Sequence, residues 1–164
     1  MRRPAILATA LLLTALSVTA CTSPTESYCQ QLKGDQQHLL TLSQRSAAKG
    51  ARGTRALGET VSLLDGLRDR APDPVKADWD TLVGALGDLS DAITASGASP
   101  ADFGSGRRPA GVTEGQLRAV QQAATQLSTT AVQQSATSIE QHAQDVCKVD
   151  LGAGLGGVGS AAGG

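Results

Sequence analysis

His38 and His142 are the side chains of this sequence best suited to metal binding or proton transfer, since imidazole titrates near neutral pH and coordinates metals. If the helices that carry them are joined through Cys29 and Cys147, the two rings differ by about 6 Å along the helix axis. The chain has no methionine after Met1 to complete a metal or haem site. We therefore expect both histidines at the surface or a helix interface, with no metal and no cofactor.

A carboxylate pair is the second candidate for chemistry. Asp65 and Asp69 lie one helical turn apart, a spacing that suits acid–base or metal chemistry, but Arg68 and Arg70 stand beside them. Alternating charges of this kind are typical of a solvated, salt-bridged helix face. The sequence also lacks a Gly-x-Ser-x-Gly elbow, a zinc pattern, a P-loop and a glycine fingerprint after a strand. It predicts no catalytic residue, and hence a protein that is not an enzyme.

Cys29 and Cys147 form the third candidate pair. A redox-active pair usually has the close Cys-x-x-Cys spacing, which is absent. If the third cysteine, Cys21, carries a lipid, Cys29 and Cys147 are the two that remain. In an exported protein, two such cysteines more often form a structural disulfide than stay free. Closing a loop of this length is worth about 4 to 5 kcal/mol by the loop-entropy estimate. The sequence therefore predicts a Cys29–Cys147 disulfide that closes almost the whole fold.

The third cysteine ends a pattern that predicts export and lipidation. Arg2 and Arg3 precede an apolar run that is too short to span a membrane, and Val18-Thr19-Ala20-Cys21 reads as a lipobox. Residues 1–20 are therefore predicted to be a lipoprotein signal peptide, and Cys21 the lipidated first residue of the processed chain. The alternative is an ordinary secretory signal near an unmodified Cys21. Two acyl chains would anchor the protein stably on the extracytoplasmic face of the cell membrane.

The lipobox resembles that of bacterial lipoproteins in general, and the composition, rich in Ala, Gly and Arg, looks actinobacterial. The Tyr28-Cys29 start, the helix around Trp79 and the late Cys147 resemble small actinobacterial helical lipoproteins of unassigned function. This resemblance covers the processed chain only loosely. It implies a lipid on Cys21 and brings no catalytic residue with it.

Composition bounds the rest. Beyond residue 20 the chain has 144 residues, enough for one domain, with 12 basic and 15 acidic side chains. Its only aromatic residues are Tyr28, Trp79 and Phe103. Because a nucleic-acid binder needs a basic stripe or stacking aromatics, no nucleic-acid partner is expected.

Hydrophobic periodicity predicts an all-α fold, an antiparallel bundle of about four helices with the Trp79 helix at its centre. Thr113 and Gln116 predict a capping box at the start of the last helix, which is expected to run unbroken or bent to about residue 149. The other expected helices cover residues 26–48, 54–70 and 74–95. The domain plan is a lipidated tether at 21–27, a helical bundle domain at 28–150 and a disordered Gly-rich tail at 151–164.

Two connections leave alternatives open. Gly97 to Gly111 is expected to be a long irregular loop, in which Arg107 and Arg108 either lie in a solvated linker or contact lipid headgroups or an anionic polymer. In the tail, Leu151 and two later apolar residues, Leu155 and Val158, are candidates for a weak contact with the body.

Three classes of function follow. A non-enzymatic binding or scaffolding protein with an envelope protein as partner, which we favour, predicts an exposed apolar strip on the first or last helix. A small-molecule or lipid carrier predicts an apolar cavity between helices. An enzyme or metal-handling protein predicts that His38, His142 and acidic residues meet in one pocket.

Overall fold

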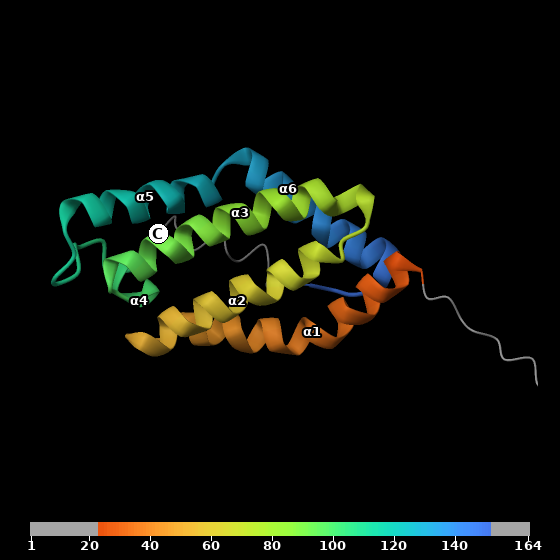
Figure 1. Ribbon diagram of the computed structural model, residues 1–164, viewed down its shortest axis with the longest axis horizontal. Coiled ribbons are helices and arrows are strands. Elements are labelled where there is room, and N and C mark those ends of the chain that lie inside the picture. The colour runs from red at the N-terminus through yellow and green to blue at the C-terminus, as the bar shows by residue number, and fades with distance from the viewer. Residues whose placement is uncertain (1–22, 152–164) are drawn as a thin grey trace, which may run out of the picture.

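The computed structural model describes residues 23–151, and this part of the chain is all-helical, without strands (Figure 1). Residues 1–22, with the predicted signal peptide and Cys21, and residues 152–164 of the predicted tail lie outside the described residues. No helix within the described range has the length and apolar character needed to cross a membrane. The elements are α1 (Pro24–Ser46), α2 (Ala51–Asp69), α3 (Asp73–Ser96), α4 (Pro100–Phe103), α5 (Glu114–Leu127), α6 (Thr130–His142) and the π-helical turn η1 (Ala143–Cys147).

The helices form the predicted antiparallel bundle, with α3 at its centre. α1 packs on α2, α2 packs on α3, and α5 and α6 lie one after the other along α3 (Figure 1). α3 buries nine residues, more than any other helix, and Trp79 among them is fully buried. The stripe around Trp79 therefore marks the core, as the sequence predicts.

Local signals set most helix ends. The Ser23 hydroxyl accepts a hydrogen bond from the backbone N–H of Glu26 at 3.1 Å and caps α1. Thr113 and Gln116 form the expected capping box at the start of α5. Asp73, which the sequence suggests as a cap, is instead the first residue of α3. There the positive end of the helix dipole and the negative charge of Asp73 attract one another, which stabilises the helix.

The last expected helix is divided. α5 ends at Leu127 and α6 begins at Thr130, with Ser128 and Thr129 between them. The hydroxyl of Thr129 donates to the Gln126 carbonyl at 2.8 Å, and Thr129 has an extended backbone at the start of α6. Such local bonds compete with the helical ladder. The bend lets α5 and α6 follow different halves of α3 rather than overhang the bundle.

Residues on both sides of the range 28–150 expected for the bundle domain are helical or buried. α1 begins at Pro24, so residues 24–27 of the expected tether are helical. At the other end Lys148 adopts a left-handed conformation with a φ of 55°, and the chain turns back over α1. The side chain of Gln36 donates a hydrogen bond to the Asp150 carbonyl, and Leu151 is buried. Leu151 thus belongs to the core. It makes the contact with the body that was the alternative to a place in a disordered tail.

A buried polar pair links the first helix to the central one. The indole N–H of Trp79 donates to the hydroxyl of Tyr28 at 3.0 Å, and both side chains have 0% exposure. Burial raises the pKa of Tyr28 above its ordinary value of 10.0, although the hydrogen bond from Trp79 acts in the opposite direction. The phenol is thus held neutral in the folded protein.

We expect Tyr28 to ionise at higher pH in the folded protein than in the urea-unfolded chain. Above pH 10.0 the unfolded chain loses a proton that the folded protein keeps, so stability falls as pH rises until the folded pKa is reached. Tyr28 is the only tyrosine of the chain, so tyrosinate absorbance reports this group alone. Equal titration midpoints in the two states would contradict the prediction. In the Tyr28→Phe variant, the part of the fall in the free energy of unfolding above pH 10.0 that is due to Tyr28 should be absent.

Candidate functional site

The predicted disulfide is present. The sulfur atoms of Cys29, near the start of α1, and Cys147, at the end of η1, are 2.02 Å apart across a sequence separation of 118 residues. The bond lies at the end of the bundle where α1 begins (Figure 1). Two residues, Thr22 and Ser23, separate Cys21 from Pro24, and the three Cα–Cα steps between them reach at most about 11 Å. The stapled end is therefore the end of the bundle closest to Cys21.

The two histidines do not meet. The ring of His142 lies 6.0 Å from the ring of Tyr28, at the stapled end. His38 is ten residues further along α1, about 15 Å, and lines a shallow depression with α2 residues such as Glu59. Residues 23–151 contain no group of three or more His, Cys, Asp or Glu side chains able to hold a metal. The pocket required by a metal-handling protein is therefore not found in this range.

The carboxylate pair is part of an ion-pair network on the surface. Arg68 lies 2.9 Å from Asp65, 3.1 Å from Asp69 and, across to α3, 3.7 Å from Asp80. All three carboxylates are well exposed. Because solvent screens exposed ion pairs, they contribute little to stability, and this network joins α2 to α3 only weakly. It is the salt-bridged face that the sequence predicts.

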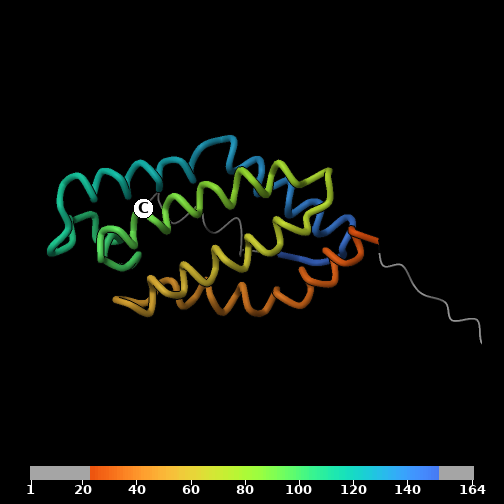
Figure 2. The backbone as a smooth tube through the Cα atoms, viewed as in Figure 1, coloured from red at the N-terminus to blue at the C-terminus, as the bar shows by residue number. Residues whose placement is uncertain are grey.

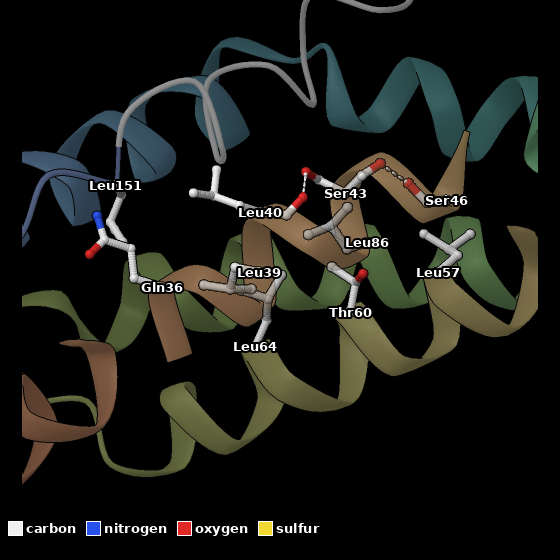
Figure 3. Close-up of a pocket in the computed structure, with 10 residues that line it drawn as sticks. All are labelled: Gln36, Leu39, Leu40, Ser43, Ser46, Leu57, Thr60, Leu64, Leu86 and Leu151. Carbon is white, nitrogen blue, oxygen red and sulfur yellow. Dashed lines mark hydrogen bonds between the residues drawn. The ribbon is translucent and has the colours of Figure 1, made fainter. Parts of the chain in front are cut away.

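An apolar pocket opens between α1, α2 and α3, and we refer to it as the leucine pocket (Figure 3). Its volume is about 90 Å³. The residues that line it are Gln36, Leu39, Leu40, Ser43, Ser46, Leu57, Thr60, Leu64, Leu86 and Leu151. No pattern within a single helix of the sequence predicts a pocket at this place.

The hydroxyl groups around the leucine pocket are occupied by their own helices. Ser43 donates to the Leu40 carbonyl at 2.9 Å, Ser46 to the Ser43 carbonyl at 2.7 Å (both drawn in Figure 3), and Thr60 to the Ala56 carbonyl at 2.8 Å. Their donors are therefore not offered to a ligand. The pocket thus presents mainly leucine side chains.

The size of the leucine pocket limits what it can hold. It is smaller than the cavity of about 150 Å³ that binds benzene, and well below the 300 to 1,000 Å³ of typical ligand sites. It suits one apolar side chain or a few methylene groups. The apolar strip expected of a scaffolding protein is reduced, among the described residues, to Leu40 at the pocket, 38% exposed, and Val146 on η1, 47% exposed.

The long irregular loop predicted from Gly97 to Gly111 is interrupted in the structure, because α4 forms inside it. The Asp102 carboxylate accepts hydrogen bonds from the backbone N–H and the hydroxyl of Ser99, at 2.8 and 2.6 Å, and this capping box starts the helix. These two bonds, together with the nearby charge of Lys49, lower the pKa of Asp102. Arg107 and Arg108 follow α4, and both are exposed.

Comparisons with known proteins assign no family. No protein-family model matches the chain, and neither curated proteins nor solved structures gave a match.

Proposed function

We propose that this chain is a non-enzymatic lipoprotein, anchored through Cys21 at the extracytoplasmic face of the cell membrane, that binds or scaffolds a partner of the cell envelope. The observation that carries the proposal is the lipobox, Val18-Thr19-Ala20-Cys21, directly behind a short apolar segment. The anchor and a structural disulfide suit one another, because disulfides persist in oxidising compartments outside the cytoplasm.

The arrangement of the bundle supports a role for surfaces away from the anchor. With two residues between Cys21 and α1, the stapled end would lie against the membrane. α1 alone extends about 34 Å from that end. The leucine pocket and the far end of the bundle would then face the envelope, where a partner protein could place one apolar side chain in the pocket.

A small-molecule or lipid carrier is the alternative, and the apolar lining of the leucine pocket favours it. The volume of about 90 Å³ weighs against it, because a lipid chain needs more space. A carrier would release a small molecule of defined mass when the protein is extracted gently from its membrane.

Changing Cys21→Ser should move the protein from the membrane fraction to the soluble fraction of a bacterium that processes lipoproteins. Without the thiol no diacylglyceryl group can attach, and two acyl chains supply the stable anchor. Intact-mass spectrometry should show the unchanged protein without residues 1–20 and with a diacylglyceryl group on Cys21.

The Thr19→Ala variant is the matched control, since it keeps a small residue in the lipobox and should behave as the unchanged protein. A membrane-free unchanged protein with an unmodified Cys21 would refute the anchoring. The same spectra, recorded under native conditions, report any bound protein, small molecule or metal, so they also separate binding protein from carrier.

A further inference from the structure

Positive charge is concentrated at the end of the bundle opposite the disulfide. Between Asp35 and Glu59 the chain has no acidic residue but four basic ones, in and beside the connection from α1 to α2. Two more follow α4. These six residues, which we refer to as the basic end, are Arg45, Lys49, Arg52, Arg55, Arg107 and Arg108. All six are exposed, and they are half of the 12 basic residues beyond residue 20.

The two basic segments are neighbours in space. The Thr54 hydroxyl, in the first turn of α2, donates to the Ala98 carbonyl just before α4 at 3.4 Å. Lys49 lies close enough to Asp102 of α4 to act on its charge. Figure 2 shows the connection from α1 to α2 and the loop after α4 at the same end of the molecule, far from the start of α1.

The charges of the basic end are not neutralised by ion pairs within the described structure. The three ion pairs found in residues 23–151 all involve Arg68, which lies on a different part of α2. Asp102 of α4 is hydrogen-bonded to Ser99, and Lys49 acts on its charge without an ion pair being formed between them. Exposed cations without partners attract anions over a range of about 8 to 10 Å in physiological salt.

We propose that the basic end binds a linear anionic polymer that carries phosphate or carboxylate groups. A protein partner would require an apolar anchor at the centre of the contact. The two large apolar side chains that are exposed in the described range, Leu40 and Val146, lie outside the basic end. A polyanion needs only charge and access, and arginine pairs well with both phosphate and carboxylate. The position of this surface away from the membrane rests on the proposed anchoring through Cys21; the binding itself does not.

The test measures binding of the full lipidated protein, in neutral detergent, to long-chain polyphosphate and to polyglutamate. Replacing Arg52, Arg55, Arg107 and Arg108 together by Gln should weaken binding of the preferred polymer at least about tenfold, since it removes four of the six cations that attract the polymer. The matched control replaces four exposed cations elsewhere by Gln, namely Lys33, Arg70, Lys76 and Arg118. It has the same net charge and should change binding less than about threefold.

Each outcome decides the proposal. Binding that weakens with salt and depends on the basic end supports it, and the preferred polymer tells phosphate from carboxylate. Equal losses in the two variants would mean attraction by net charge alone, and overturn it. No binding to either polymer also overturns it, as does binding to phosphatidylglycerol vesicles alone, which would identify a membrane contact. If a protein whose Cys21 is unmodified binds the polymer, the proposal for the basic end is supported and only the proposed anchoring through Cys21 is refuted.

Discussion

Removing the Cys29–Cys147 disulfide should lower the free energy of unfolding by about 5 kcal/mol, the largest effect we expect from any change in this chain. The bond closes a loop of 118 residues, nearly all of the described bundle. Without it the unfolded chain gains many conformations that the crosslink excludes. Because small domains are stable by about 5 to 15 kcal/mol, the loss would leave the bundle marginal.

Urea unfolding followed by circular dichroism should show this loss in the Cys29→Ser, Cys147→Ser double variant. The unchanged protein under a reducing agent should unfold at nearly the same urea concentration, and the agent should not affect the double variant. A difference below about 1 kcal/mol between oxidised and reduced protein would contradict the prediction. It would mean that packing of η1 on α1 holds the chain ends together without the bond.

The elements that the sequence predicts well are those whose causes are local. Helical spacing of apolar residues around Trp79 marks the central helix, and Thr113 with Gln116 marks the start of α5. The disulfide could be predicted from topology, because an even number of antiparallel helices brings both ends of the chain together. Cys29 and Cys147 then lie at the same end of the bundle.

Other features depend on competition that one sequence does not resolve. The hydroxyls of Ser128 and Thr129 can bond to the backbone in a continuous helix as well as at a break, and packing along α3 decides for the bend. Leu151 follows a helix end in a Gly-rich context, yet it is buried because Lys148 turns the chain back over α1. A left-handed lysine has no strong sequence signal, so the burial of Leu151 does not follow from the sequence.

The candidate surfaces are less predictable than the helices. The leucine pocket forms where leucines from α1, α2 and α3 meet around smaller side chains such as Thr60, and no single helix pattern contains it. The doublet Leu39-Leu40 is the one local signal, since a helix cannot bury both residues equally well. Arg107 and Arg108 are visible in the sequence as a pair, but their neighbours Arg52 and Arg55 come from a distant segment.

Replacing Trp79 by Ala should lower the free energy of unfolding by about 3 to 5 kcal/mol. The side chain is fully buried in the second turn of α3, the longest helix described, and its removal leaves a cavity that neighbouring helices fill only in part. The Tyr28 hydroxyl would also lose its hydrogen-bond donor in a buried place. Circular dichroism in urea is the suitable measurement, because Trp79 is the only tryptophan and the variant has no indole fluorescence.

Two further variants separate the causes of this loss. Trp79→Phe keeps most of the packing but leaves the Tyr28 hydroxyl without its partner, so it should cost about 1 to 3 kcal/mol. Val146→Ala removes an exposed apolar side chain and should change stability by less than about 0.5 kcal/mol. If Trp79→Ala costs no more than Val146→Ala, α3 is not the centre of the core. If Trp79→Phe is neutral, the bond between Trp79 and Tyr28 contributes nothing, and packing alone joins α1 to α3.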